Sequence, residues 1–496
     1  MFNRSTALAA VVLSLLVDAG AVKAETLLDA IDLAYQTNPT LQQQRATQRA
    51  LDETYVQARA ALRPTLDVTG GDSFLHTSEN DTTFLPGAYQ QNTQNVAVNL
   101  SQPVTTGGAA TEAIRAAARD VLQGREQLRA TEIQIMAQVI QFYVDVIRDT
   151  EALRIDQSNL LTLQRQLQAT SAQFDVGEVT RTDVSQAEAR LAAAQSAVLQ
   201  AQAQLQISRA NYAQAVGRPP GELAPPPALP GVPSNFDAAL DVAEKENPNL
   251  RAAQYAEEAA RARVGEARAA YRPTVSINAT YQWQHGPIPF VANPYQRTVQ
   301  ATATATIPLF AGGSRGSKVR QTLEQDNEAL YAIEGQRRTV LQNVSQTWAT
   351  VLSTHAQTLA NEEQVKSAAV ASEGERQEAQ VGLRTTIDVL NAVQEYANAQ
   401  LQLVVSRHDE YVAAAQLLAS MGRLEIRYLN PALPAYDPRR NFDRVRNLGW
   451  LPIDPVVEAL DAAGAPREHN PYTPTSAPID HDLGARSVAN PEPKEP

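Results

Sequence analysis

The sequence predicts a mainly helical chain that carries a pair of amphipathic β-hairpins and is built as a tandem duplication. Three observations lead to this prediction. Two long stretches contain no proline and are rich in Ala and Gln, as long helices are. Each stretch is preceded by two segments in which apolar and polar residues alternate, as they do in strands. The same landmarks then return in the same order, at an offset of roughly 205 to 209 residues.

Four landmarks define the duplication, and chance does not produce such an ordered set. In first and second copy they are Asn38-Pro39 and Asn247-Pro248, Arg63-Pro64 and Arg272-Pro273, Gly107-Gly108 and Gly312-Gly313, and Val176-Gly177 and Val381-Gly382. We therefore expect a first repeat over residues 25–218 and a second over residues 236–430. A proline-rich linker over residues 219–235 joins them.

The first 24 residues have the features of a secretory signal peptide. Arg4 supplies the basic region, residues 7–17 the apolar region, and Val22-Lys23-Ala24 a cleavage site with small residues. A membrane-spanning anchor would need roughly 20 apolar residues, which this run does not reach. No later stretch is a candidate transmembrane helix. We expect an exported protein in which any membrane insertion uses strands.

Each repeat begins with a helix of moderate length between the Asn-Pro and Arg-Pro landmarks, because proline is favoured at the first position of a helix and excluded from its interior. A β-hairpin follows, over residues 64–104 in the first repeat and 273–308 in the second. The alternation is strictest between Val275 and Trp283, where apolar residues are separated by hydroxyl and amide side chains. Each hairpin should be apolar on one face and polar on the other.

A long helical hairpin completes each repeat, over residues 107–216 and 312–421. Its descending arm would be roughly 100 Å long at 1.5 Å per residue, and its returning arm about half as long. The moderate helices should stack end to end on the returning arms and restore the full length. The first returning arm has a heptad pattern. The members of this stripe are Val184, Ala187, Leu191, Ala194, Val198, Ala201, Leu205, Ser208 and Tyr212.

The end of the chain, residues 431–496, has no sustained periodicity and is rich in Pro, Asp, Arg and Asn. We expect a C-terminal strap that is at most partly ordered, followed by a disordered tail beyond about Pro466.

The four strands predict an assembly, because two of them would present unpaired backbone groups at the edges of the sheet. Two chains would give eight strands, whose side chains fill the barrel. Three chains would give twelve strands and an open pore. We therefore expect a homotrimer with a shared 12-stranded β-barrel continued by a long α-helical barrel. The alternative is a half-buried sheet in a soluble protein, but the Ala- and Gln-rich helices offer it no matching apolar cover.

Several functional classes are excluded or disfavoured by composition. The net charge of −12 argues against nucleic acid as a partner. The absence of cysteine excludes disulfides, thiolate sites and a lipid attached to cysteine. The six histidines are scattered, and the run from Gly312 to Lys318 lacks the spacing of a phosphate-binding loop. We expect no cofactor, no metal and no enzymatic activity.

The ordered set of landmarks resembles the TolC-like outer-membrane efflux proteins, over almost all of residues 25–430. The resemblance implies a homotrimer in the outer membrane of a Gram-negative bacterium, with a long periplasmic part. It further implies a passive exit duct that docks onto a periplasmic adaptor protein and, through it, an inner-membrane ABC or proton-driven transporter. The pattern Tyr436-Asp437-Pro438 is similar to the branch that serves type I secretion. The heptads alone would also fit a non-conducting structural or adhesive coiled coil, which needs neither strands nor glycine turns.

The same resemblance implies roles for residues at the helical turns. In the family the periplasmic tip is a gate, and Arg384 falls on its arginine, Asp183 on a carboxylate partner and Asp388 on a ring of aspartates. Asn391 stands where a second aspartate occurs in the family, and Ala379 where a tyrosine is common. An ordinary helical turn with solvated caps is the alternative interpretation.

The adaptor would dock on the two turns themselves. These are Val176-Gly177-Glu178 in the first repeat and Val381-Gly382-Leu383 in the second.

Overall fold

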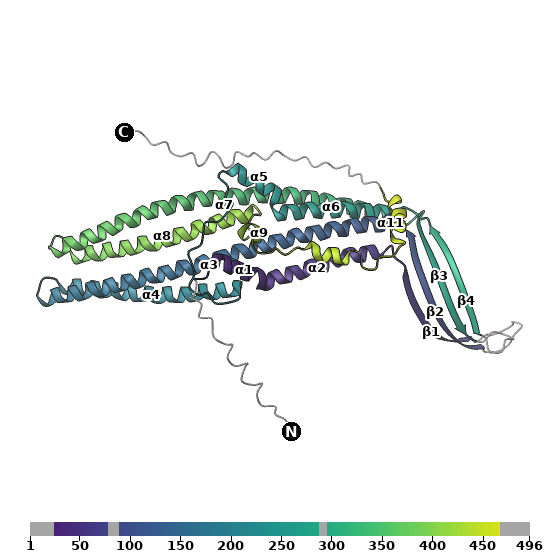
Figure 1. Cartoon of the computed structure of the whole chain (residues 1–496), viewed down its shortest axis with the longest axis horizontal. Helices are drawn as coiled ribbons and strands as arrows, with labels where there is room; N and C mark the ends of the chain where they lie inside the picture. The colour runs from purple at the N-terminus through teal and green to yellow at the C-terminus, as the bar shows by residue number, and fades with distance from the viewer. Residues whose placement is uncertain (1–23, 78–88, 287–294, 467–496) are drawn as a thin grey trace, which may run out of the picture.

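The computed structural model describes residues 24–77, 89–286 and 295–466. The signal peptide expected over residues 1–24 and the tail expected beyond Pro466 lie outside these residues, apart from Ala24. The chain is strongly elongated (Figure 1). Its helices run along the long axis, the sheet lies at one end, and the turns of the two helical hairpins lie at the other.

The two repeats have the same order of elements, two helices, two strands and two long helices. The first comprises α1 (Leu27–Thr37), α2 (Pro39–Ala60), β1 (Thr65–Thr77), β2 (Tyr89–Thr105), α3 (Ala109–Asp175) and α4 (Arg181–Val216). The second comprises α5 (Phe236–Glu246), α6 (Pro248–Ala269), β3 (Thr274–His285), β4 (Tyr295–Thr306), α7 (Ser314–Gln380) and α8 (Thr386–Ser420). Helices α1 and α5 are additions to the elements expected from the sequence.

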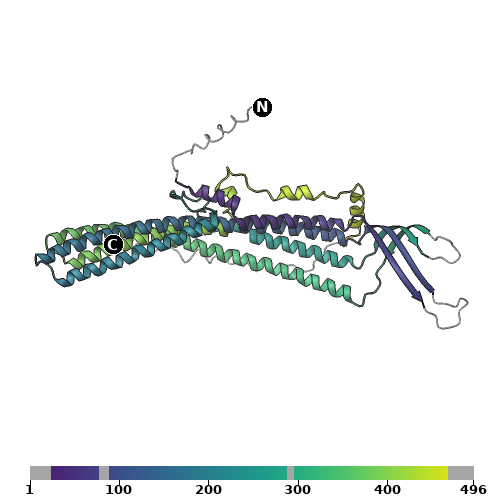
Figure 2. The same ribbon diagram turned by 90° about the horizontal axis from the view of Figure 1, so that it is seen from below.

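The C-terminal segment also contains helices that its composition did not predict. They are α9 (Ile426–Leu429), α10 (Arg439–Val445) and α11 (Asp454–Ala463). Each is too short to show a periodic pattern, so its helical state depends on packing against the rest of the chain. Figure 2 shows this segment following α2 to the foot of the strands. Helix α10 contacts α2, and α11 contacts both β2 and α3.

The Asn-Pro landmarks join helices end to end. The side-chain oxygen of Asn38 accepts hydrogen bonds from the N–H groups of Thr40 and Leu41, which caps α2. Its amide donates to the carbonyl of Ala215, 3.0 Å away in the last turn of α4. Asn247 repeats the arrangement between α6 and the carbonyl of Ser420, at 2.9 Å. One side chain therefore satisfies backbone groups of two helices, and α2 and α6 continue the lines of α4 and α8.

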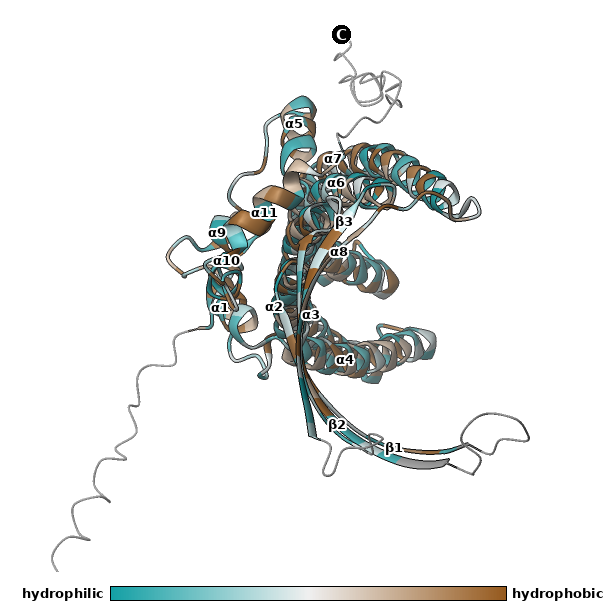
Figure 3. Cartoon of the chain, turned by 90° about the vertical axis from the view of Figure 1, so that its right-hand side faces the viewer, coloured by the Kyte–Doolittle hydropathy of each residue, from teal (hydrophilic) through white to brown (hydrophobic). Residues whose placement is uncertain are grey.

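The helices form an arc when the molecule is viewed along its long axis (Figure 3). Helix α2 packs on α3, and α6 lies between α3 and α7. Helices α1, α5, α9, α10 and α11 lie on the convex side of this arc. None of the helices in the part of the chain that the structure describes is both long and apolar enough to cross a membrane.

The strands form one antiparallel sheet in the order β1-β2-β3-β4. Its register places Val68, Val98, Tyr281 and Val299 side by side across all four strands. Directly opposed residues point to the same face, so this face is apolar. The other face carries hydroxyl and amide side chains such as Thr280. Within the described ranges, β1 and β4 each have a partner on one side only.

The largest apolar core lies near the middle of the molecule, where α1, α3, α4, α8 and α9 meet. Tyr143 and Tyr212 are fully buried there. The hydroxyl of Tyr143 lies 2.8 Å from the carbonyl oxygen of Glu25 and 2.7 Å from that of Ala224. These contacts hold the start of the first repeat and the inter-repeat linker against α3.

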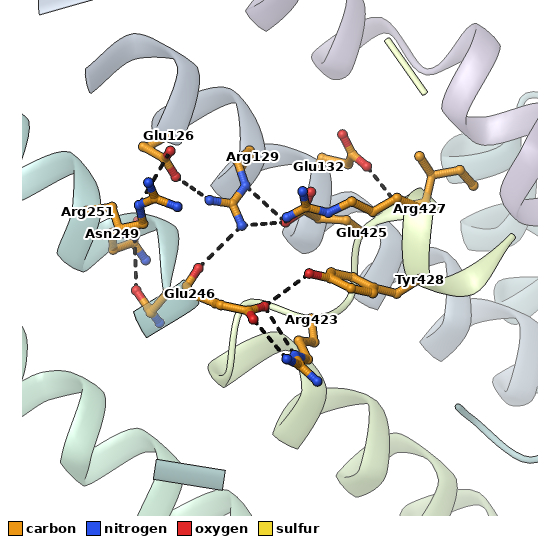
Figure 4. A network of polar contacts seen from close by, with 12 residues as sticks. Glu126, Arg129, Glu132, Glu246, Asn249, Arg251, Arg423, Glu425, Arg427 and Tyr428 are labelled. Atoms are coloured by element: carbon orange, nitrogen blue, oxygen red, sulfur yellow. Dashed lines mark hydrogen bonds and ion pairs between the residues drawn. The ribbon is translucent and has the colours of Figure 1, made fainter. Parts of the chain in front are cut away.

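A polar network beside this core ties the two repeats together (Figure 4). Arg129 of α3 donates to Glu425 with both Nε and Nη2, at 3.0 and 2.7 Å. It also pairs with Glu126, one turn earlier on α3. Arg423 forms a two-pronged pair with Glu246, which lies at the end of α5. Because Glu425 and Glu126 are buried, these partners compensate for the cost of removing their charges from water.

Candidate functional site

The turns at the far end of the helical hairpins have one geometry in both repeats. Gly177 and Gly382 adopt left-handed φ values of 81° and 78°, which a residue with a side chain rarely adopts. The next residue then donates back across the turn, Glu178 to the carbonyl of Gln173 and Leu383 to that of Glu378. This C-terminal motif satisfies carbonyls that α3 and α7 would otherwise leave unpaired.

The returning helices α4 and α8 begin with identical capping boxes. The Asp183 carboxylate accepts from the hydroxyl and the N–H of Thr180, at 2.7 and 2.8 Å. Asp388 accepts from Thr385 at 2.7 and 3.0 Å. Hydrogen bonds from the threonine hydroxyl, and then from its N–H, lower the pKa of each carboxyl below its ordinary value. Both predicted gate aspartates therefore fix the starts of their helices.

Arg384 lies in the second turn and pairs within its own hairpin. Its Nε donates to Glu378 Oε2 at 2.7 Å, and both side chains are about half exposed. Among the described residues of the single chain, no ion pair joins Arg384 to Asp183. The expected partnership between Arg384 and Asp183 thus remains a prediction about neighbouring hairpins.

A cleft of about 1100 Å³ separates the two helical hairpins near their tips. Its walls include Glu178 and Asp183 from the first hairpin and Gly382 and Arg384 from the second. Asp388 and Asn391 are not among its lining residues. The structure therefore brings one predicted basic and one predicted acidic gate residue to the same cleft.

One hydrogen bond near the tips joins the two hairpins directly. Arg190 of α4 donates from Nη2 to Asn391 Oδ1 of α8 at 2.9 Å. An apolar cluster next to it buries Leu163, Ala187 and Leu390. Asn391 is therefore a point of contact between the repeats.

The docking surface expected at the turns is apolar and accessible. Val176, Val381 and Leu383 are 70 to 75% exposed at the ends of the hairpins. Added Cβ atoms at Gly177 and Gly382 would meet no other atom within 4 Å. Each turn therefore presents a small apolar patch with open space around it.

Two residues of this region were not identified from the sequence. Glu378 could have been found from the helix dipole, because a carboxylate in the last turn of α7 is unfavourable unless a cation lies near it. Arg190 carries no such signal, since an exposed arginine on a polar helix face is common. In the described parts of the chain, no cluster of His, Cys, Asp and Glu has the composition to hold a metal ion.

The sequence is similar to outer-membrane channels along most of its length. A family model for outer membrane efflux proteins matches residues 30–218 and 239–423. The outer membrane efflux protein BepC of Brucella suis is 32% identical over 440 residues, which cover 88% of this chain and 94% of BepC. The alkaline protease secretion protein AprF of Pseudomonas aeruginosa is 25% identical over 411 residues, covering 80% of this chain and 85% of AprF.

Solved structures of channels have the same fold. The outer membrane protein VceC of Vibrio cholerae superposes with a TM-score of 0.68 at 21% identity, covering 80% of this chain and 96% of VceC. The CmeC outer membrane channel of Campylobacter jejuni gives a TM-score of 0.72 at 15% identity, covering 85% and 89%. The fold class predicted from the sequence is confirmed. With both repeats matched by the family model, the chain belongs to the outer membrane efflux protein family.

Proposed function

We propose that this chain is one protomer of a trimeric exit duct in the outer membrane. The duct passively conducts substrate that an inner-membrane transporter delivers through a periplasmic adaptor. The observation that carries this proposal is the sheet, which has one apolar face and one polar face, and whose edge strands β1 and β4 each pair on one side only among the described residues. Such a sheet is stable in lipid only when further copies pair with β1 and β4.

In an assembly of three copies, both faces of the sheet have a suitable environment. Twelve strands close a barrel wide enough to hold water, with the polar face toward the lumen and the apolar face toward lipid. The helical hairpins then continue the tube away from the membrane. A non-conducting coiled coil would need neither the two-faced sheet nor the glycine turns.

A protein other than this chain determines which class of substrate is exported. Relatives are named for efflux and for secretion of alkaline protease. A lumen lined by hydroxyl and amide groups forms few specific contacts with what passes through it. We infer that the transporter selects the substrate.

The tips are the proposed gate and docking surface. Arg384 is held by a single exposed ion pair with Glu378, and such pairs contribute only about 0.2 to 1 kcal/mol. Adaptor docking can therefore exchange the partner of Arg384 at little cost. Asp183 and Glu178, on the facing wall of the cleft, are the acidic groups available for that exchange.

Planar-bilayer recording of the purified, detergent-solubilised trimer tests the channel directly. We expect discrete conductance steps, and longer openings for Arg384→Ala. Arg338→Ala is the matched control, because Arg338 forms an exposed ion pair with Glu334 of its own helix α7 and does not line the cleft. A trimer that conducts no ions, even with Arg384 replaced, would refute the duct.

A further inference from the structure

Helix α11 has an inverted distribution of polar and apolar residues. The side it packs against the protein carries the buried residues Asp454, Val457 and Asp461. The opposite side carries Val456 and Leu460, which are 62% and 50% exposed. A helix on the surface of a soluble protein has the reverse arrangement. Figure 3 shows the ribbon of α11 largely in brown, on the convex side of the arc.

Strong polar contacts fix α11 in this orientation. The Asp461 carboxylate is fully buried and accepts hydrogen bonds from the N–H groups of Thr106, Gly108 and Thr111. Asp454 pairs with Arg63 at 3.1 Å. Rotating α11 to bury its apolar side would leave both carboxylates without these partners, which is costly for groups of this kind. The apolar side must therefore face outward.

The position of α11 places this side next to the apolar face of the sheet. A β-bulge between Pro103 and Thr105 brings Thr105 opposite Val275. Val275 belongs to the apolar face, so Thr105 does too. The hydroxyl of Thr105 donates to Asp461 Oδ1 at 3.1 Å. Helix α11 thus lies at the foot of the sheet, on its apolar side.

The length of the strands sets the level of the membrane boundary. A tilted strand needs about 9 to 11 residues to cross the hydrocarbon core. Strands β3 and β4 have 12 residues each, so the foot of the sheet falls at the bilayer surface. Leu448 and Trp450, in the segment before α11, are also more than half exposed. Tryptophan is favoured at this depth because its ring is apolar and its N–H is polar.

We propose that α11 and the segment before it rest on the periplasmic surface of the outer membrane, with Trp450, Val456 and Leu460 among the phospholipid headgroups and upper acyl chains. This proposal rests on the membrane placement of the sheet. The helix lies in the plane of the interface, as amphipathic surface helices do. It braces the junction between sheet and helices from the lipid side.

A second copy of the chain is the competing occupant of this surface. Leu309 and Phe310, which follow the end of β4, are almost fully exposed. The arrangement favours lipid, because α11 contacts β2 inside the sheet, whereas the next copy pairs at the edge strands β1 and β4.

Site-specific labelling distinguishes lipid from a second copy of the chain. Because the chain has no native cysteine, only the introduced residue is labelled. Val456→Cys would carry a polarity-sensitive nitrobenzoxadiazole label in trimers reconstituted into phosphatidylethanolamine and phosphatidylglycerol vesicles. Nitroxide-labelled phospholipid should quench this label and its emission should be shifted to the blue. Val299→Cys, on the apolar face of β4, is the positive control. Asp443→Cys, exposed on α10, is the negative control and should be quenched only by aqueous iodide.

Each outcome decides the proposal. Quenching by lipid nitroxide at both Val456→Cys and Val299→Cys supports it. Suppose that the label at Val299→Cys reports lipid but the label at Val456→Cys is quenched only by iodide, or by neither quencher because another chain covers the site. Either result overturns the proposal. Loss of lipid quenching at both positions refutes the membrane placement itself. Leu460→Cys repeats the measurement one turn later, which guards against a local effect of a single substitution.

Discussion

Arg190 and Asn391 form the hydrogen bond that connects α4 to α8 near the tips, at 2.9 Å between Nη2 and Oδ1. The two residues come from different repeats and lie a few turns above the glycine turns. A contact in this place holds one hairpin against the other, so its strength should affect how readily the tips separate.

Replacing Asn391 should therefore change channel opening. Asn391→Ala removes the bond, which is exposed and contributes about 0.5 kcal/mol per chain. Over three chains, its loss should lower the ratio of closed to open channels about tenfold. Asn391→Asp turns it into an ion pair and should shorten openings. Single-channel open times measure both effects.

The matched control for this pair is Gln394→Ala, because Gln394 donates only to Asn398 of its own helix. It should leave open times unchanged. If Arg190→Ala did not cancel the effect of Asn391→Asp, the contact would not be the cause.

Leu383→Ser should weaken adaptor binding without affecting the trimer. Leu383 is exposed at the end of the second hairpin, so its loss removes apolar area from the proposed docking patch and nothing from the core. The measurement is the amount of adaptor that copurifies with the trimer after cross-linking in cells.

Leu359→Ser is the control, since Leu359 is similarly exposed but lies within α7, away from the tip. Gly382→Trp should have a stronger effect than Leu383→Ser and abolish export, because it adds bulk and strains a left-handed backbone. Equal adaptor recovery from the Leu383 and Leu359 variants would argue against docking at the turns.

The parts of the fold that follow from periodic patterns could be predicted from the sequence. Residues of the heptad stripe on α4, such as Ala187, Val198 and Tyr212, are buried as that pattern requires. The strict alternation after Pro273 appears as β3. Such a pattern indicates which side of a helix or strand is buried, because the spacing of side chains around each element is fixed by its own backbone geometry.

The rest depends on contacts between distant parts of the chain. Helix α11 has two carboxylates on its buried side. Donors before and within the first turn of α3 make the burial of Asp461 favourable, and Arg63 does so for Asp454. Similarly, the turn residues Arg384 and Asp388 could be located in the sequence, but the partner of Arg384 in a single chain, Glu378, required the structure.

Asp461→Asn should loosen the junction between sheet and helices. Thr106 and Gly108 donate to Oδ1 of Asp461, and Thr111 donates to Oδ2. An amide with its oxygen in the Oδ1 position keeps the first set but turns an NH2 group toward the Thr111 N–H, which loses an acceptor at a cost of about 2 kcal/mol. We expect a lower melting temperature and faster hydrogen exchange across α11. Asp443→Asn, which removes only a surface pair with Arg446 at α10, should change both much less.

The effect of Asp461→Asn should also depend on pH. Burial alone would raise the pKa of Asp461, but the hydrogen bonds from Thr106, Thr111 and Gly108 together lower it below its ordinary value of 3.8. A lowered pKa adds stability above pH 3.8, and this stability is lost as the pH falls through the folded value. The difference between wild type and variant should therefore narrow in acid. A constant difference would mean that the charge of Asp461 is not what holds α11.

Glu132→Gln should stabilise the protein at neutral and alkaline pH. Burial, with a further contribution from nearby Glu425, raises the pKa of Glu132 from 4.5 to about 7, although the N–H of Ile426 donates to it at 2.9 Å. The folded state therefore prefers the neutral acid. This preference stabilises the fold at pH below 4.5 and is lost as the pH rises through 7.

Because the pKa of Glu132 is raised from 4.5 to about 7, ionising Glu132 in the folded protein costs about 3 kcal/mol per chain at pH 8. Glutamine is neutral at every pH and keeps an oxygen for Ile426. The melting temperature of Glu132→Gln should thus match wild type near pH 4.5 and exceed it increasingly toward pH 8. Glu363→Gln, whose pair with Lys366 is at the surface, should track wild type throughout. Parallel curves for wild type and Glu132→Gln would show that Glu132 is already charged in the folded protein.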